Sequence, residues 1–511
     1  MKENLGPVST RMRWALTGVT AVLTLALVVI MRHGPGLTPD SYSYLSAARA
    51  LAHHGRLTIY DGTSLVAFPP GLSVALAGLL RLGLGLTPAT VTLNALGYAA
   101  TAVGIFGILR VVLHRDGIAL ALTAALLATG TFLSFYLVLL SEPVFLGVTF
   151  LALAALLHGV ARGRLTPRTL TLVVLGAGVT ELWRFTGVVI VPAVVLAWLF
   201  TQAWPWRLTT LVRAAGLGAL ASLGALVVVV RDLALGTGPF GPTVTSSTPL
   251  GQIPQQIAHL AGSLASSSLV VPFTSRYPSW YESGSRAELL VGAVLIALVV
   301  AGVGRALRRR DLPVILLAAF TGLYWALLVY AESSNTQFNM NPRLAAPTAA
   351  GDLALAAYAL APLARGSAKA LLGRLGLAGL TLAVSAGALT LVSYTAQPLY
   401  GVPPVAVTPA VHVVDHLPAS VGVLTEDGAK LYWNSGHVPV VDMPAPSFFC
   451  PPDCVRAVEH RIRHDVRDHT LTYAIFGSRL SGREQANIVP GVSGRLVRAG
   501  AGYALYRLSV R

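Results

Sequence analysis

The sequence predicts an all-α polytopic membrane protein with about eleven transmembrane helices, interfacial juxtamembrane helices and a small C-terminal extracytoplasmic α/β domain. Of its 511 residues, 54% are apolar and only 11% are charged, whereas an ordinary soluble domain carries about 25% charged residues. Apolar runs of about 20 residues, the length with which a helix crosses a bilayer, recur along most of the chain. A more polar sequence follows residue 395.

Eleven of the apolar runs are predicted to cross the membrane. They cover residues 14–31, 90–111, 118–138, 143–161, 169–183, 185–203, 214–231, 288–304, 313–331, 344–364 and 375–395. The first run has the length of a signal peptide, but no small-residue cleavage site follows it, so we interpret it as a helix. A further apolar stretch, 68–86, begins with Phe68-Pro-Pro-Gly71 and contains Arg81. We interpret it as a juxtamembrane or re-entrant segment.

The basic residues indicate the orientation of the chain. The net charge is +16, and 26 of the 37 basic residues precede residue 395, mostly between apolar spans. With the N-terminus inside and 68–86 not crossing, 17 of these 26 fall in short inside loops, as the positive-inside rule requires. The charge therefore argues against nucleic-acid binding. Few lysines and many arginines and alanines are typical of a GC-rich bacterial genome, so we expect a bacterial cytoplasmic (inner) membrane with the N-terminus cytoplasmic.

This topology divides the chain into a transmembrane module, residues 1–395, and an extracytoplasmic domain, residues 396–511. The module has two long outer loops, 32–89 and 232–287. In the outer domain, strand-like runs and one charged helical run predict an α/β fold. The strands are Val421–Thr425, Val438–Met443, Leu471–Phe476 and Tyr503–Leu508, and the helix covers 453–468. A disulfide between Cys450 and Cys454 is favoured outside the membrane over a metal half-site, which lacks partners at standard spacing.

Asp40 is the most informative residue of the first outer loop. Residues 39–55 are predicted to form an amphipathic interfacial helix, because Pro39-Asp40-Ser41 is a start signal and Gly55 a stop signal. A carboxylate just outside the bilayer is then either a helix cap or a base or metal ligand at the membrane surface. Tyr44 lies on the same helix and is a candidate substrate contact.

Three further charged residues are predicted on the same outer face. Glu142, in Ser141-Glu142-Pro143, has the chemistry of a helix start, yet only 12 acidic residues precede residue 395, so it is a candidate partner of Asp40. Arg343 opens a span, where an arginine opposes the helix dipole unless an anion such as a phosphate lies there. Arg184 is either a second phosphate ligand or the ion-pair partner of Glu181.

An aromatic group lies in the second outer loop. Tyr277, Trp280 and Tyr281 form either an aromatic belt at the membrane interface or a stacking surface for a sugar or other substrate. The sequence contains no glycine-rich phosphate loop, which argues against nucleotide-driven transport.

Together, these residues resemble the GT-C fold glycosyltransferases that use polyprenyl-phosphate sugars, such as the protein O-mannosyltransferases and the aminoarabinose transferase of lipid A. The resemblance covers about residues 14–395 and rests on Pro39-Asp40-Ser41, Phe68-Pro-Pro-Gly71, Ser141-Glu142-Pro143, Arg184 and Arg343. Two features differ from those families. The chain has one acid at Asp40 where the mannosyltransferases have an adjacent pair, and Phe68 stands where the lipid A enzymes have a basic residue. The subfamily and the acceptor therefore stay open.

The resemblance implies inverting transfer of a sugar from a polyprenyl-phosphate donor to a lipid, glycan or protein acceptor. Asp40 would be the general base, Arg343 and Arg184 would hold the lipid phosphate, and Glu142 would orient the acceptor, assist as a second carboxylate or help to hold a metal. The need for a divalent metal is left open. The main alternative is a multi-pass transporter or lipid flippase, which predicts charges at the bilayer midplane and internal repeats. An O-antigen ligase or polymerase and a non-catalytic scaffold are further alternatives.

Overall fold

The computed structural model describes residues 6–236, 253–268, 286–334, 341–361, 413–414, 416–418, 421–425, 440–442, 452–476, 485–500 and 503–510. The chain divides into two compact units, which we call the helical unit and the sheet unit. The helical unit comprises Met1–Pro35, Val66–Gly71 and Thr87–Tyr400, and the sheet unit comprises Gly36–Leu65, Leu72–Leu86 and Gly401–Arg511. Most of the first predicted outer loop thus belongs to the same unit as the C-terminal part of the chain.

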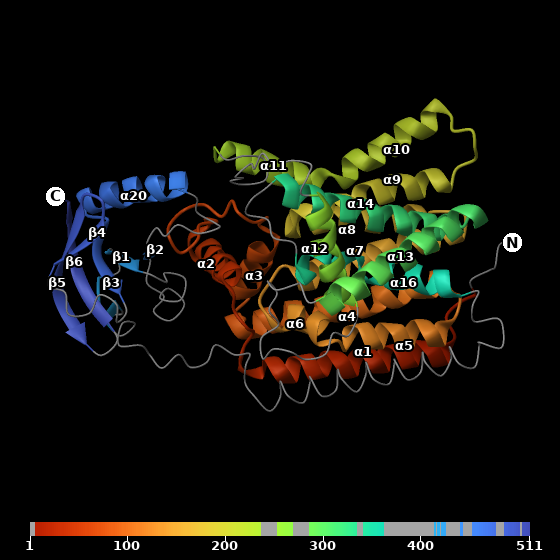
Figure 1. Ribbon diagram of the computed structural model, residues 1–511, viewed down its shortest axis with the longest axis horizontal. Coiled ribbons are helices and arrows are strands. Elements are labelled where there is room, and N and C mark those ends of the chain that lie inside the picture. The colour runs from red at the N-terminus through yellow and green to blue at the C-terminus, as the bar shows by residue number, and fades with distance from the viewer. Residues whose placement is uncertain are drawn as a thin grey trace. The chain divides into compact units, whose positions relative to one another are not determined.

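The helical unit is built from apolar helices, several of which run side by side (Figure 1). They are α1 (Thr10–Ile30), η1 (Met31–His33), α4 (Leu86–Leu113), α5 (Asp116–Leu127), α6 (Gly130–Leu137), α7 (Glu142–Ala161), α8 (Pro167–Trp183), η2 (Phe185–Val189), α9 (Ile190–Phe200), α10 (Leu208–Ala221), α11 (Leu223–Ala234), α12 (Ile253–Ser268), α13 (Arg286–Arg309), α14 (Leu312–Ser334), α15 (Pro342–Ala345), η4 (Ala346–Thr348) and α16 (Ala349–Leu360). One large apolar core runs through this unit.

Among the described residues, five helices are long and apolar enough to cross a membrane, namely α1, α4, α7, α13 and α14. The pair α10 and α11, which is bent by 52°, makes a sixth if it counts as one span. The prediction of several membrane-length apolar helices is therefore confirmed. Predicted span 375–395 lies outside the described residues, and the count of about eleven stays a prediction.

Three predicted spans are interrupted in the structure. Span 118–138 is divided because Thr129 caps a new helix: its hydroxyl accepts a hydrogen bond from the Phe132 N–H (3.2 Å). Span 344–364 contains the 3₁₀ turn η4 at Pro347, which has no N–H for an α-helical hydrogen bond. Span 214–231 is divided at Ser222, where α10 and α11 are bent by 52°. A further break lies between the predicted spans 169–183 and 185–203, where Arg184 is extended (φ −151°, ψ 141°) and separates α8 from η2. This last break places a charged side chain at the end of a helix.

Helices α4 and α7 approach each other closely at glycines. A Cβ on Gly97 of α4 would collide with the backbone of Pro143, the second residue of α7. A Cβ on Gly147 would lie 2.8 Å from the Gly97 carbonyl oxygen. Small residues are what allow helix backbones to come this near in a membrane protein. The contact fixes the start of α7, where Glu142 lies.

We expect Gly97→Ala to destabilise the protein by about 1–3 kcal/mol, the usual cost of forcing an extra methyl group into a packed contact. The measurement is the melting temperature of the detergent-solubilised protein. Gly216→Ala is the matched control, because a Cβ at that position of α10 would meet no atom within 4 Å. Equal melting temperatures for Gly97→Ala and the control would contradict the close approach of α4 and α7.

The sheet unit contains two short helices from the first outer loop, α2 (Pro39–His54) and α3 (Gly71–Arg81). Helix α2 confirms the predicted helix: Thr38 and Ser41 form a capping box at its start, and Gly55, with φ 70°, ends it. The 11 residues of α3 extend over about 16 Å, roughly half of a hydrocarbon core of about 30 Å. This length agrees with the prediction that 68–86 does not cross the membrane.

The C-terminal part of the sheet unit is a six-stranded mixed sheet with the strand order β2-β1-β3-β6-β5-β4. Its strands are β1 (Gly422–Thr425), β2 (Val440–Asp442), β3 (Leu471–Phe476), β4 (Gln485–Val489), β5 (Val492–Gly500) and β6 (Tyr503–Val510). The pairs β1–β2 and β1–β3 are parallel, and the other pairs are antiparallel. Helix α20 (Pro452–Arg467) packs on β3 and β6 and buries Ile462 and Val466 (Figure 1).

All four predicted strands and the predicted charged helix are present, and β4 and β5 were not predicted. Cys450 lies outside the described residues, so its disulfide with Cys454 stays a prediction.

Candidate functional site

Glu142 is the first residue of α7 and follows a short link from α6. The side chain of Asn94 holds this link, since its amide nitrogen donates to the carbonyl oxygens of Tyr136 (2.7 Å) and Val138 (3.0 Å). Proline at the second helical position suits the helix start. The Glu142 side chain is only 1% exposed. A carboxylate buried to this degree requires partners of opposite charge.

Two arginines from distant parts of the chain provide those partners. Arg184 donates from its terminal nitrogen to Oε1 of Glu142 and to Oγ of Ser141 (3.2 Å), and its guanidinium lies 5.8 Å from the ring centre of Phe145. Arg343 pairs with the same carboxylate oxygen through Nε, at 3.0 Å. We call Glu142, Arg184 and Arg343 the arginine–glutamate cluster.

The local backbone explains how each arginine reaches Glu142. Arg184 lies in the break between α8 and η2, and its N–H still donates to the Thr180 carbonyl oxygen (2.9 Å). Arg343 is the second residue of α15, whose N-cap Asn341 accepts a hydrogen bond from the Leu344 N–H (3.2 Å). The sequence predicted that an arginine at such a helix start needs an anion nearby. In this structure, Glu142 is such an anion.

The cluster carries an excess of positive charge. It holds one carboxylate and two guanidiniums, and the arginine side chains are 15% and 17% exposed. Each guanidinium has five N–H donors, more than one carboxylate can use. The arrangement is therefore suited to a further anion, and bidentate binding of phosphate is a common role of arginine. It is poorly suited to a metal ion at Glu142, since two cations already surround that carboxylate.

Glu181 does not take the role that the sequence left open for it. Its Oε2 accepts a hydrogen bond from the Ala225 N–H (2.7 Å) in the first turn of α11. The carboxylate therefore stabilises the start of a helix after the bend at Ser222. Arg184 pairs with Glu142 instead, so the ion pair between Arg184 and Glu181 was the wrong alternative.

Asp40 and Tyr44 belong to the sheet unit, not to the helical unit. Asp40 is not the helix cap, because the hydroxyl of Thr38 accepts the hydrogen bond from the Ser41 N–H (3.4 Å). The Asp40 carboxylate still lies in the first turn, where it complements the helix dipole. Tyr44 is buried, and its carbonyl oxygen accepts a hydrogen bond from the Ser73 hydroxyl (3.1 Å).

The predicted aromatic residues of the second outer loop are not described by the structure. Tyr277, Trp280 and Tyr281 lie outside the described residues. Among the residues that are described, no group of three or more His, Cys, Asp or Glu side chains could hold a metal ion. The predictions for the aromatic residues and for a divalent metal therefore stay untested.

Helix α12 was not foreseen, because residues 232–287 were interpreted as a loop. It packs against α14 and against α15, which carries Arg343. Nδ1 of His259 lies 2.9 Å from Oε1 of Glu332 on α14. The buried residues of α12 recur with helical spacing, and this pattern could have identified the helix in the sequence. They are Leu260, Ala261, Leu264 and Ala265.

Comparison with known proteins shows which fold this is. No protein-family model matches the chain, and no curated protein matches it in sequence. Among solved structures, ArnT from Cupriavidus metallidurans in the apo state is 14% identical, with a TM-score of 0.60 and 98% of both chains covered. The same protein bound to undecaprenyl phosphate is 15% identical, with a TM-score of 0.57, and 97% of this chain and 98% of that chain are covered.

An oligosaccharyltransferase is also similar. AglB from Archaeoglobus fulgidus, in complex with an inhibitory peptide and a dolichol-phosphate, is 13% identical, with a TM-score of 0.55, and 92% of this chain and 70% of that chain are covered. At identities this low, the likeness establishes the fold alone. Because the match to ArnT extends over nearly the whole length of both chains, the protein has the GT-C fold.

Proposed function

We propose that the protein is a membrane glycosyltransferase that moves a sugar from a polyprenyl-phosphate donor to an acceptor outside the cytoplasm, with inversion. The observation that carries this proposal is the arginine–glutamate cluster, a buried site with an excess of positive charge. A phosphate that leaves during glycosyl transfer needs such a site, since negative charge develops on it in the transition state. ArnT with undecaprenyl phosphate and AglB with a dolichol-phosphate have the same fold, which supports a lipid-phosphate donor.

In the proposed reaction, an acceptor hydroxyl or amine attacks the anomeric carbon of the donor sugar. The bond between that carbon and the phosphate oxygen breaks, and the oxygen leaves with the electron pair. Arg343 and Arg184 hold the departing phosphate, and Glu142 orients their guanidiniums. Asp40 accepts the proton of the acceptor. The sugar, the acceptor and the carrier lipid are not specified by these residues.

The proposed location follows from the same chemistry. A polyprenyl tail remains in the bilayer, so the donor reaches the enzyme from the membrane. We propose a multi-pass protein of the bacterial cytoplasmic membrane with its N-terminus in the cytoplasm and its C-terminal domain outside. Accessibility of single engineered cysteines to a membrane-impermeant reagent tests this orientation. Labelling of the C-terminal domain only after permeabilisation would contradict it.

We expect Asp40→Asn to lower sugar transfer by about 10²- to 10⁴-fold, the usual contribution of a general base. The measurement is transfer of radiolabelled sugar from polyprenyl-phosphate donors in membranes with matched expression levels. Thr38→Ala is the matched control, because it removes the cap of α2, costs about 1 kcal/mol of helix stability and keeps the carboxylate.

The outcomes separate three interpretations. Loss of product in Asp40→Asn but not in Thr38→Ala supports Asp40 as the base. If Asp40→Asn is no worse than Thr38→Ala, the carboxylate acts only through the helix and the catalytic role is wrong. If wild type yields no product with any donor, glycosyl transfer is contradicted, and lipid or sugar flux becomes the reaction to assay.

A further inference from the structure

The residues that follow the Asp40 helix form a short hairpin, residues 57–65. The Leu65 N–H donates to the Leu57 carbonyl oxygen (2.9 Å), and the Ile59 N–H donates to that of Thr63 (2.8 Å). At the tip, Oδ1 of Asp61 accepts hydrogen bonds from the backbone N–H (2.8 Å) and the hydroxyl (2.6 Å) of Thr63. One carboxylate oxygen therefore stabilises the turn itself. The other oxygen and the Asp61 carbonyl remain available for a contact outside the hairpin.

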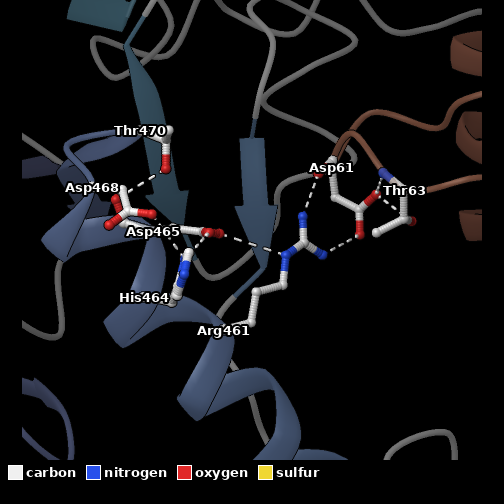
Figure 2. A network of polar contacts seen from close by, with 7 residues as sticks. All are labelled: Asp61, Thr63, Arg461, His464, Asp465, Asp468 and Thr470. Atoms are coloured by element: carbon white, nitrogen blue, oxygen red, sulfur yellow. Dashed lines mark hydrogen bonds and ion pairs between the residues drawn. The ribbon is translucent and has the colours of Figure 1, made fainter.

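Arg461 of α20 makes that contact, across 400 residues of sequence (Figure 2). One terminal nitrogen donates to the Asp61 carbonyl oxygen (2.8 Å), and the other lies 3.4 Å from Oδ2 of Asp61. Its Nε lies 3.5 Å from Oδ2 of Asp465, one helical turn further along α20. The guanidinium thus joins the hairpin tip to a helix that packs on the sheet. Because it binds a backbone oxygen as well as a carboxylate, it fixes the position of the tip and not only its charge.

A second contact seats the same hairpin on the sheet. The Val440 N–H of edge strand β2 donates to the Tyr60 carbonyl oxygen (3.2 Å). The Tyr60 side chain packs against a buried group that includes Val423 and Val440. Apolar packing and the Arg461 contact therefore act on adjacent residues, Tyr60 and Asp61.

The hairpin is also tied closely to the Asp40 helix. Only Gly55 and Arg56 separate the end of α2 from Leu57. The end of α2 is held in turn by Arg81 of α3, whose guanidinium donates to the carbonyl oxygens of Leu51 (2.9 Å) and Ala52 (3.1 Å). The end of α2 is therefore held from two sides, by α3 through Arg81 and by the hairpin through the two linking residues.

We propose that Arg461 is a positioning residue for the transfer reaction: through Asp61 it fixes hairpin 57–65, and with it the Asp40 helix, on the C-terminal sheet. This role rests on the proposed function, because it matters for catalysis only if Asp40 is the base. This positioning role gives the C-terminal domain a task in the reaction that does not require the domain to contact the substrate.

The test uses the full-length protein in lipid nanodiscs and two independent readouts. Hydrogen exchange reports whether the hairpin is held, and steady-state transfer kinetics report whether this matters for the reaction. In Arg461→Ala we expect faster exchange at the amides of Ile59 and Leu65, with exchange in β3 unchanged. We expect kcat to fall by about 5- to 100-fold, as for a misplaced catalytic group, with the KM for the donor unchanged.

Two further variants make the test specific. Arg463→Ala is the matched control: it lies two residues away on α20, and its guanidinium donates to the Pro490 carbonyl oxygen (3.4 Å) within the sheet domain. It should leave the hairpin and kcat as in wild type. Arg461→Lys keeps the charge but loses the planar geometry, and we expect an intermediate kcat.

Each outcome is decisive. Unchanged exchange in Arg461→Ala would contradict the contact, and faster exchange with an unchanged kcat would contradict the positioning role. Faster exchange in β3 as well would mean that Arg461 only stabilises the domain, which also overturns the proposal. If wild type transfers no sugar, the proposed function and the positioning role are rejected together, whereas the exchange comparison still tests the contact itself.

Discussion

Replacement of Glu142 by glutamine is expected to destabilise the protein by about 3–5 kcal/mol, the usual cost of removing one partner from a buried ion pair. Glu142 is fully enclosed and is the carboxylate that Arg184 and Arg343 share. A neutral amide would leave two largely buried guanidiniums without a counter-charge. The melting temperature of the protein in detergent measures the effect.

Glu181→Gln is the matched control for this prediction. Glu181 is also 1% exposed, but its Oε2 accepts a hydrogen bond from the Ala225 N–H, which an amide oxygen can also do. We therefore expect a much smaller loss of stability. If both variants melt alike, burial alone accounts for the effect and the arginine–glutamate cluster is not the cause.

The same variant tests whether the cluster receives an anion. In Glu142→Gln, a bound phosphate would replace the missing negative charge between the two arginines. Added polyprenyl phosphate should then raise the melting temperature of Glu142→Gln more than that of wild type. A smaller rise in the variant would contradict phosphate binding between Arg184 and Arg343.

The sequence allowed each member of the cluster to be identified, but not the way in which they meet. Glu142, Arg184 and Arg343 were selected because charged residues are rare in apolar segments and each lies at the end of a helix. Which carboxylate Arg184 would bind depends on the break at the end of α8 and on the packing of α7 beside it. Such tertiary information is absent from local patterns, which offered only the nearer Glu181 as an ion-pair partner of Arg184.

The parts of the fold that were missed have a similar explanation. Helix α12 alternates small, polar and apolar residues, so mean hydropathy suggested a loop, although its buried positions follow a helical period. Strands β4 and β5 mix apolar residues with polar residues and glycines, and their clearest signal was the turn at Pro490-Gly491, where Gly491 has φ 83°. Residues 36–65 form one compact unit with the C-terminal part because of long-range contacts, such as the contact of Asp61 with Arg461. Local sequence patterns do not contain such contacts.

Replacement of Arg343 by alanine is expected to weaken binding of a polyprenyl phosphate by about 10- to 100-fold. A hydrogen bond to a charged group contributes about 1.5–3 kcal/mol, which corresponds to this range. Stability should change less than in Glu142→Gln, because Glu142 would still be paired with Arg184. Arg343→Lys keeps the charge without the planar fork, so its affinity should lie between those of wild type and Arg343→Ala.

Two controls distinguish phosphate recognition from a general effect on the bundle. Arg305→Ala removes an arginine that donates to the Tyr358 carbonyl oxygen (2.9 Å) and lies over the Tyr358 ring. This variant should bind the polyprenyl phosphate as tightly as wild type does. A polyprenol without phosphate should bind wild type and Arg343→Ala equally, because the bilayer-embedded tail makes the same contacts in both. Equal loss of affinity for the polyprenol and the phosphate would mean that Arg343 supports lipid binding only through packing. Loss confined to the phosphate would mean that Arg343 recognises the group that leaves during sugar transfer.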